Sequence, residues 1–197
     1  MREIALFPLN LFLLPGDYTQ LYIFEDRYKQ LIKHCLNTYS QFGLPFSNKL
    51  NTKNYGTLVS LVEVVKEYPG GEMDVVIKAE GIFKLEQFFY QIDNKLYPGG
   101  RVTDLEIPTE AKASASLEAS FKNYLIQHEI YNSELLAKQK LGLFEIANAL
   151  QMNDLERLEL VSLGSDRAMD RFLINYLRYL ELLHEQEQNV FQNLYLN

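Results

Sequence analysis

The spacing of apolar residues changes near Pro108, and this change constrains the fold more than any other feature of the chain. In residues 1–107, segments with alternating apolar and polar positions indicate strands with one buried face. In residues 108–197, apolar residues recur every three or four positions, which indicates amphipathic helices. Pro108 cannot continue a strand ladder and biases Ile107 toward an extended conformation. The pattern therefore predicts an α+β protein with a β-rich half, residues 1–107, and a helical half, residues 108–197.

Four consecutive strands are predicted in the β-rich half. They cover residues 56–67, 73–80, 83–92 and 95–105. The segment Tyr68-Pro69-Gly70-Gly71 separates the first two strands, because proline and glycine supply the fixed φ and then the positive φ that a tight turn needs. Short turns between consecutive strands indicate an antiparallel sheet or a small barrel.

Helices are predicted from apolar stripes and from capping residues. One helix interrupts the β-rich half at residues 25–37, and its apolar positions include Phe24, Tyr28 and Cys35. In the helical half, Asn153 and Glu156 have the spacing of a capping box. Gly164-Ser165 is typical of a helix end followed by a new N-cap, and a long apolar stripe from Met169 to Leu183 marks the last helix. We expect these stripes to be packing faces.

Charge and cysteine content restrict the class of protein. Lys and Arg number 19 against 26 Asp and Glu, so the net charge is −7, and the cations form no cluster that would neutralise phosphates. This disfavours general nucleic-acid binding. No apolar run reaches the roughly 20 residues of a membrane span, and the N-terminus lacks a secretory signal pattern. A single cysteine, Cys35, at a helical core position fits a reducing compartment, so we expect a cytoplasmic protein.

The sequence contains no complete catalytic pattern. The chain has no phosphate-binding glycine loop with Lys and Ser or Thr. Gly164-Ser165-Asp166-Arg167 lacks the second glycine of a hydrolase elbow, and His184-Glu185 lacks the second histidine of a zinc protease helix. We therefore expect no enzyme activity, no cofactor and no metal. An unrecognised hydrolase is the alternative, with Cys35 or Ser165 as its nucleophile.

Two segments near the N-terminus carry a resemblance to a known family. Phe7-Pro8-Leu9 through Leu14-Pro15-Gly16, followed by Phe24-Glu25-Asp26-Arg27-Tyr28, resembles the opening of the Lon protease N-terminal domain. The matching positions are Phe7, Pro8, Pro15, Gly16, Phe24, Glu25, Arg27 and Tyr28. Two positions depart from the family pattern: Asp26 replaces a proline at the helix start, and Ile82 replaces an arginine before Phe83.

The resemblance implies both a fold and a role. The implied fold is a PUA-like, β-rich barrel joined to a helical bundle that ends in a long helix, the two halves together forming one Lon-type domain. In full-length Lon this region helps to recognise substrate proteins, while the ATPase and protease domains lie downstream. We therefore expect a non-catalytic module, without ATPase or protease domains, that binds unfolded or specific protein or peptide partners. RNA binding by a PUA-like barrel is the alternative. The oligomeric state stays open, with a weak homodimer among the alternatives.

The residues that carry the resemblance are expected to be mainly structural. Phe24 and Tyr28 lie one helical turn apart and are predicted to pack together, while Arg27 is predicted to brace the helix against the sheet through a carboxylate. Partner-binding aromatics are expected among exposed side chains near turns and strand ends. The candidates are Tyr18, Phe46, Tyr68 and Tyr90, with Tyr68 favoured because it flanks the Pro-Gly turn. A cleft between the two halves is the expected place for a ligand.

Overall fold

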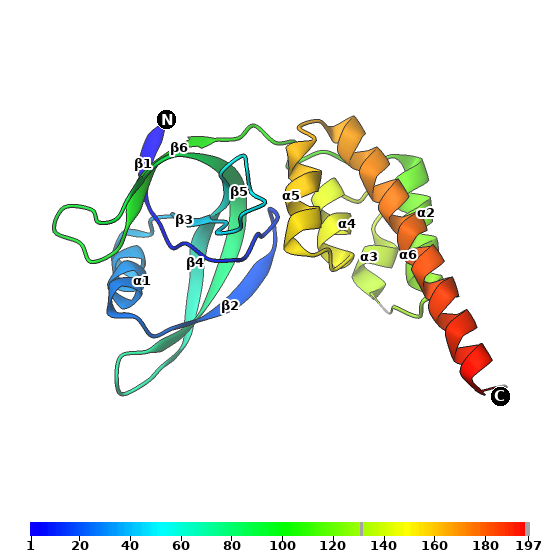
Figure 1. Cartoon of the computed structure of the whole chain (residues 1–197), viewed down its shortest axis with the longest axis horizontal. Coiled ribbons are helices and arrows are strands. Elements are labelled where there is room, and N and C mark those ends of the chain that lie inside the picture. Colours follow the sequence, from blue (N-terminus) through cyan, green and yellow to red (C-terminus); the bar gives the residue numbers. More distant parts are fainter. Residues whose placement is uncertain (131, 196–197) are drawn as a thin grey trace.

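The computed structural model describes residues 1–130 and 132–195, with side chains described up to residue 186. Figure 1 shows a β-rich half and a helical half side by side. The strands are β1 (Arg2–Ala5), β2 (Tyr18–Ile23), β3 (Phe42–Pro45), β4 (Tyr55–Glu67), β5 (Met73–Phe89) and β6 (Gly99–Asp104). The helices are α1 (Asp26–Thr38), α2 (Ala115–Gln127), α3 (Ser133–Ala137), α4 (Leu143–Ala149), α5 (Asp154–Ser162) and α6 (Asp166–Tyr195). The predicted α+β class is confirmed.

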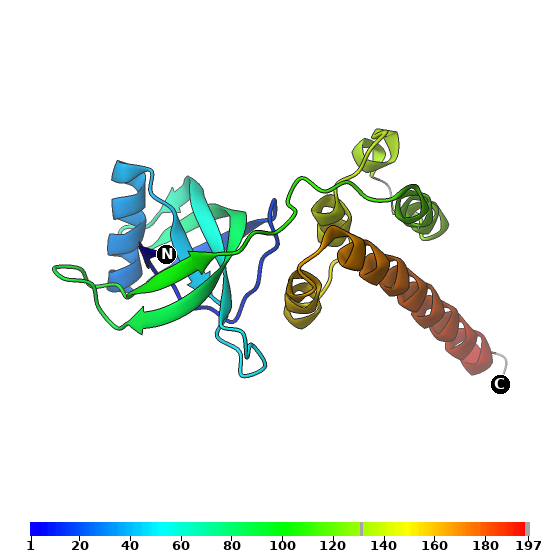
Figure 2. The ribbon, with the colours of Figure 1, turned by 90° about the horizontal axis from the view of Figure 1, so that it is seen from above.

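The β-rich half is one antiparallel sheet around the long strand β5. The strand order is β1-β6-β5-β4-β3, and β2 pairs with the first part of β5 outside this path. Viewed from above, α1 covers the side of the sheet that lies away from the helical half (Figure 2). Because β2 pairs with β5 alone, one side of β2 has no strand partner among the described residues.

The predicted closed barrel is not confirmed. Closure would need a continuous ladder between the terminal strands β1 and β3. Segment 6–9, which follows β1, instead makes isolated parallel bridges with β3 and the residue after it, Leu6 with Gly43 and Leu9 with Phe46. The sheet therefore curves without closing, and pairings so far apart in sequence leave no signal in local spacing.

The prediction of two separate strands at 73–80 and 83–92 was wrong, because β5 runs through both. Its register against β4 skips Glu80, so the strand bends at a bulge there without ending. The predicted strand at 95–105 begins later, at Gly99. The turn before β5 is as expected: Gly71 has φ +80, and the Tyr68 N–H donates to the Glu72 carbonyl at 2.8 Å.

The helical half begins after the loop that follows β6, and its caps match the sequence. Asn153 and Glu156 form the predicted capping box at the start of α5. Gly164 has φ +68 between α5 and α6, and the Ser165 hydroxyl accepts from the Ala168 N–H at 3.4 Å. Helix α6 packs along α2 and extends past the other helices in Figures 1 and 2. Within the described part of the chain, no helix is both long and apolar enough to cross a membrane.

An extended segment, residues 11–17, lies between the two halves, and both faces of its middle part, residues 12–15, are buried. The side chains of Phe12 and Leu14 belong to the core cluster of the helical half. Leu13, which points the other way, belongs to the cluster under α1 and the sheet. We call residues 11–17 the strap. Its unbroken run of apolar residues follows from this double burial.

Candidate functional site

The strap attaches the β-rich half to the helical half and fixes where β2 begins. Three polar contacts make this attachment. They are the Phe12 N–H donating to Asp154 Oδ1 (2.9 Å), the Asn148 Nδ2 donating to the Pro15 carbonyl (3.1 Å), and the ion pair between Asp17 and Arg157. The Asp17 and Arg157 side chains are only 15% and 14% exposed, so this pair is shielded from solvent and holds the joint more firmly than a surface pair would.

A glycine bulge turns the chain from the strap into β2. Gly16 has φ +88, and both Gly16 and Asp17 bond to Ala79: the Gly16 N–H donates to the Ala79 carbonyl at 2.9 Å, and the Ala79 N–H donates to the Asp17 carbonyl at 2.8 Å. Two residues thus oppose one, which is the geometry of a bulge with glycine at the left-handed position. From Tyr18 onward, β2 then runs in continuous register along β5.

The side chains of β2 alternate between the core and solvent. Ile23 is buried and Leu21 is half-buried, while Tyr18 and Tyr22 on the opposite face are 59% and 54% exposed. Gln20 lies between the two tyrosines and is also exposed. The outward face of a six-residue strand therefore presents two large aromatic side chains to solvent.

Two further aromatics extend this surface toward the β4–β5 turn. Phe24, just after β2, is 60% exposed and stacks on Tyr22 with ring centroids 6.0 Å apart. Tyr68, from the turn, meets Tyr22 edge-on at 5.9 Å. We call Tyr18, Tyr22, Phe24 and Tyr68 the aromatic face. Tyr22 thus contacts both Phe24 and Tyr68; Tyr22 and Phe24 stay largely in solvent, while Tyr68 is half-buried.

Polar neighbours fix the orientation of Tyr68 in this face. Its hydroxyl donates to Asp74 Oδ2 at 2.8 Å, and the Lys66 ammonium lies 4.3 Å from its ring centroid. The hydrogen bond to Asp74, together with burial, raises the pKa of Tyr68. The phenol therefore stays protonated at neutral pH, and it is held as a donor and a contact surface.

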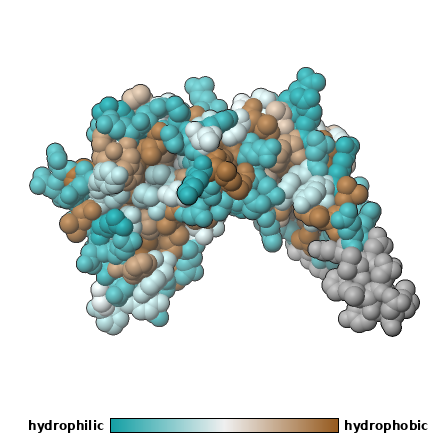
Figure 3. Space-filling model, in the orientation of Figure 1, coloured by the Kyte–Doolittle hydropathy of each residue, from teal (hydrophilic) through white to brown (hydrophobic). Residues whose placement is uncertain are grey.

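A cleft lies between the two halves, where the sequence led us to expect one. Its volume is about 600 Å³, and the β-rich half contributes Pro15, Gly16, Lys78, Ala79 and Glu80 while the loop before α2, α3 and α4 contribute the rest. A second depression of about 410 Å³ lies between Tyr18 and the segment 152–157. Tyr18 pairs with Lys78 in the register of β2 and β5, so the aromatic face continues into the joint between the halves. Figure 3 shows an open notch between the halves on the lower side of the molecule.

The cleft itself is polar, in contrast to the aromatic face. Lys138 pairs with Glu145 at 2.6 Å, and Lys78 pairs with Glu80 at 3.3 Å. Burial opposes ionisation of Glu145, but Lys138 and the Gly142 N–H outweigh burial and lower the pKa of Glu145. Asn148 Oδ1 is buried and has no hydrogen-bond partner in the described structure. The cleft therefore suits polar groups, whereas the aromatic face suits apolar ones.

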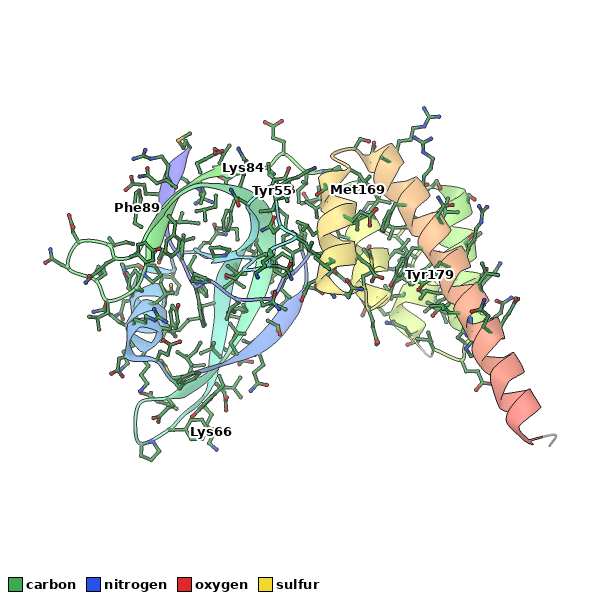
Figure 4. The ribbon with its side chains drawn as sticks, in the orientation of Figure 1. Tyr55, Lys66, Lys84, Phe89, Met169 and Tyr179 are labelled. Carbon is green, nitrogen blue, oxygen red and sulfur yellow. The ribbon has the colours of Figure 1, made fainter. Side chains whose placement is uncertain are left out.

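The four partner-binding candidates do not form one site. Tyr18 and Tyr68 lie on the aromatic face, and Tyr90 is 90% exposed but follows the far end of β5. Figure 4 labels Phe89, next to Tyr90, and Lys66, near Tyr68, at opposite ends of the sheet. The expected exposure of Phe46 was wrong: it is 4% exposed and packs against Phe12 at the joint, 5.6 Å between centroids.

Two residues of the aromatic face were not predicted as surface residues. Phe24 was expected to pack on Tyr28, but Tyr28 stacks on Phe7 at 3.8 Å and Phe24 stays outside the core. Tyr22 was missed because β2 itself was not predicted, although Thr19, Leu21 and Ile23 alternate with Tyr18, Gln20 and Tyr22. That alternation is the signal that could have revealed this face.

The other residues of the N-terminal resemblance have structural roles. Arg27 does pair with a carboxylate, but its partner is Glu25 at the start of its own helix, 2.6 Å away. Phe7 is buried and Pro8 is half-buried in the segment that bridges to β3, while Pro15 and Gly16 shape the strap.

Groups that could support chemistry lie away from the aromatic face. Cys35 is buried, and burial raises the pKa of its thiol, as expected for a core position. His34 hydrogen-bonds the buried Tyr97 through Nδ1. In the part of the chain that the structure describes, no three His, Cys, Asp or Glu side chains are grouped to hold a metal ion. The arrangement on the aromatic face is one of contact area rather than of reactive groups.

Comparisons with known proteins agree with this architecture. A family model described as the ATP-dependent protease La (LON) substrate-binding domain matches residues 3–189. Among solved structures, a Lon N-terminal domain protein from Xanthomonas campestris is 21% identical with a TM-score of 0.66, covering 91% of this chain and 99% of its own. The N-terminal domain of a Mycobacterium avium complex Lon protease is 14% identical with a TM-score of 0.63, covering 90% and 98%. No curated protein matches the sequence.

Proposed function

Because the chain belongs to the family of Lon substrate-binding domains, we propose that it binds unfolded or specific polypeptide partners through its aromatic face. One observation carries the proposal: Tyr22 contacts both Phe24 and the half-buried Tyr68, and yet Tyr22 and Phe24 remain open to solvent. Clustered aromatics supply contact area at low entropic cost and dominate the energy of many interfaces. A contiguous exposed patch of this kind marks an interaction surface in soluble proteins.

The proposed role is binding without bond-making chemistry. The Tyr68 hydroxyl is engaged by Asp74, and the Lys66 ammonium lies over the Tyr68 ring. These groups can orient a partner through hydrogen bonds and through contact with the Tyr68 ring. The single, buried cysteine fits a reducing compartment, and we place the binding in the cytoplasm.

The test is binding of a permanently unfolded protein, reduced and carboxymethylated lactalbumin carrying a fluorescent label, measured by fluorescence anisotropy. The double variant Tyr22→Ala/Phe24→Ala removes the centre of the aromatic face. We expect at least a tenfold loss of affinity, since one such contact contributes about 1–2 kcal/mol and tenfold is about 1.4 kcal/mol. Tyr90→Ala is the matched control, an equally large exposed aromatic elsewhere, and should stay within about twofold.

Two results would overturn the proposal. One is equal loss of affinity in the Tyr90→Ala control and in the double variant, which would mean that no specific face is used. The other is displacement of the labelled protein by single-stranded RNA at low salt, which would favour the RNA-binding alternative. We expect RNA to leave the anisotropy unchanged, because the protein carries a net charge of −7.

A further inference from the structure

Strand β2 exposes hydrogen-bonding groups along its outer side. In an antiparallel ladder, alternate residues bond to the partner strand and the others point away. Asp17 bonds to Ala79, so by this alternation Thr19, Leu21 and Ile23 bond to β5. The N–H and C=O groups of Tyr18, Gln20 and Tyr22 therefore point outward. Three residues with two groups each present six backbone groups, none with a protein partner in the described structure.

Strands β2, β5 and the later part of β4 form a three-stranded region whose other unpaired edge lies on β4. That edge is protected against pairing with another chain. Strand β4 pairs with β3 only up to Val59, so residues 60–67 lack a strand on that side. The register of β4 shifts between Leu61 and Glu63 and again between Val64 and Lys66, and the segment carries Glu63, Lys66 and Glu67. Bulges and charges are the usual means by which proteins prevent a free edge from pairing with another chain.

Strand β2 has neither protection. Its sequence, Tyr-Thr-Gln-Leu-Tyr-Ile, contains no charge and no proline, and its register along β5 is unbroken. It borders the joint between the halves, because Tyr18 and Thr19 line a depression with segment 152–157 of the helical half. Figure 1 shows β2 on the side of the sheet that faces the helices. The helical half thus limits the room beside this edge for a folded sheet, whereas a single extended chain needs far less width.

We propose that the free edge of β2 takes up an extended segment of a partner polypeptide as an added strand. This inference rests on the proposed function and specifies how that binding works. The added strand bonds to the outward backbone groups of Tyr18, Gln20 and Tyr22, and its side chains on that face contact the aromatic face. Main-chain bonds give affinity with little dependence on sequence, which is the property of strand addition.

Charge favours a segment that is basic at one end. The β4–β5 turn region, residues 63–74, contains four acidic residues (Glu63, Glu67, Glu72 and Asp74) and one basic residue (Lys66), so its formal charge is −4 + 1 = −3. The Lys29 ammonium of α1 lies 3.8 Å from Glu72 and offsets one of these negative charges, and the region stays acidic. A strand added along β2 ends beside this region, since Ile23 pairs with Met73. The partner segment is therefore uncharged and alternately apolar in its middle, with lysine or arginine at the end that lies beside this region.

The first test uses a variant that blocks the edge and keeps the sheet. Gln20→Pro removes one outward N–H and leaves the bonds to β5 in place, which is the position where an edge strand tolerates proline. The probe is a fluorescent decapeptide in which valine and phenylalanine alternate with threonine and which carries lysine at one end. We expect at least tenfold weaker binding for Gln20→Pro and a change within about twofold for the control Gln20→Ala.

The second test needs no variant and so does not depend on folding. Two versions of the decapeptide are N-methylated at alternate residues, one version at each parity. Only one edge of an added strand faces β2, so the two versions should differ at least tenfold in affinity for the wild-type protein. Equal affinities would overturn strand addition, because recognition by side chains alone does not distinguish the two edges.

The outcomes separate the two proposals. If Tyr22→Ala/Phe24→Ala weakens binding of the decapeptide but Gln20→Pro and methylation do not, strand addition fails and the proposed function stands. If the wild-type protein binds neither the decapeptide nor unfolded lactalbumin, both fail. If sedimentation shows a dimer that Gln20→Pro dissociates, the edge is occupied by a second copy of the chain, which overturns the polypeptide occupant proposed here.

Discussion

The two halves of the molecule bury their cores in different ways. The β-rich half has two clusters made entirely of its own residues, one under α1 and one between β1, β4, β5 and β6. The cluster of the helical half is larger, and it includes four residues of the other half. They are Phe12, Leu14, Phe46 and Ile82. The helical half therefore completes its core with side chains that the β-rich half supplies.

This asymmetry bears on how the binding surface is held. The aromatic face lies wholly on the β-rich half, but the strap that leads into β2 is anchored by Asn148, Asp154 and Arg157 of the helical half. We propose that the halves, 1–107 and 108–197, form one folding unit with the strap as its shared core element. On this view the helices position the start of β2 without touching most of the face.

The largest expected effect comes from removing the shared core. Phe12→Ala deletes a fully buried ring of the strap, and such a change costs about 3–5 kcal/mol of unfolding free energy. Urea unfolding followed by circular dichroism measures the total loss of unfolding free energy. Hydrogen exchange shows which helices and strands lose protection. We expect lower protection in α2, α4, α5 and α6, because Phe12 belongs to their cluster.

The matched control is Phe42→Ala, an equally buried ring in the cluster under α1. It should lower protection first in the sheet and in α1. The same exchange pattern for both variants, or separate unfolding transitions for the two halves, would contradict the asymmetry described above.

A smaller effect is expected from the ion pair across the joint. Arg157→Ala leaves the Asp17 carboxylate shielded and without its partner, and also removes a bond from Arg157 Nε to the Met152 carbonyl at 2.8 Å. The expected loss is about 2 kcal/mol, between the roughly 0.2–1 of exposed pairs and the 3–5 of broken buried pairs. Arg2→Ala, which breaks the exposed pair with Asp104, should cost about 1 kcal/mol or less. If urea unfolding gave the same loss of unfolding free energy for Arg157→Ala and Arg2→Ala, the ion pair across the joint would contribute no more than an exposed pair.

Local sequence patterns predicted the local elements well. Helix α1 was placed to within one residue at each end, and the Pro-Gly turn and the α5 capping box were confirmed. These features depend on φ preferences and capping residues that lie within a few positions of one another. Local sequence is therefore enough to predict them.

Features that depend on distant pairing were not accessible in the same way. Phe46 was expected to be exposed because a turn follows it. It is buried because it packs against Phe12, which is distant in the sequence. Phe24 was assigned to the apolar face of α1 because it lies four residues before Tyr28, but the chain has not yet entered the helix there. Strand β2 is short and ends just before α1, so its alternation was not recognised as a strand, and the aromatic face was missed with it.

A still smaller effect tests whether the turn into β2 matters for binding as well as for stability. Gly16→Ala places a side chain at φ +88 but makes only an ordinary 3.7 Å contact with Asn148. The expected cost is about 1–2 kcal/mol of backbone strain. Gly164→Ala, at φ +68 in open space between α5 and α6, should cost about the same. Only the Gly16 variant should also weaken the decapeptide, since it displaces the start of β2. Equal binding by both variants would show that β2 is positioned without the bulge.

The smallest effect is a pH dependence confined to the helical half. Burial alone would raise the pKa of Glu145, but its bonds to Lys138 and to the Gly142 N–H outweigh burial and lower it. A carboxyl whose folded pKa is lowered contributes stability above its unfolded pKa, and this contribution is lost as the pH falls through the folded value. We therefore expect α3 and α4 to lose hydrogen-exchange protection as the pH is lowered below the usual range of a glutamate.

Glu145→Gln keeps an oxygen for the Gly142 N–H but cannot titrate, so it should flatten this dependence. Glu145 bonds only to Lys138 and Gly142 of the helical half in the described structure, and it is more than a third exposed, so its effect is small and local. The sheet and the aromatic face should therefore not respond. A loss of protection in β2 over the same pH range, abolished by Glu145→Gln, would instead connect the cleft to the binding edge and remove the difference between the two halves.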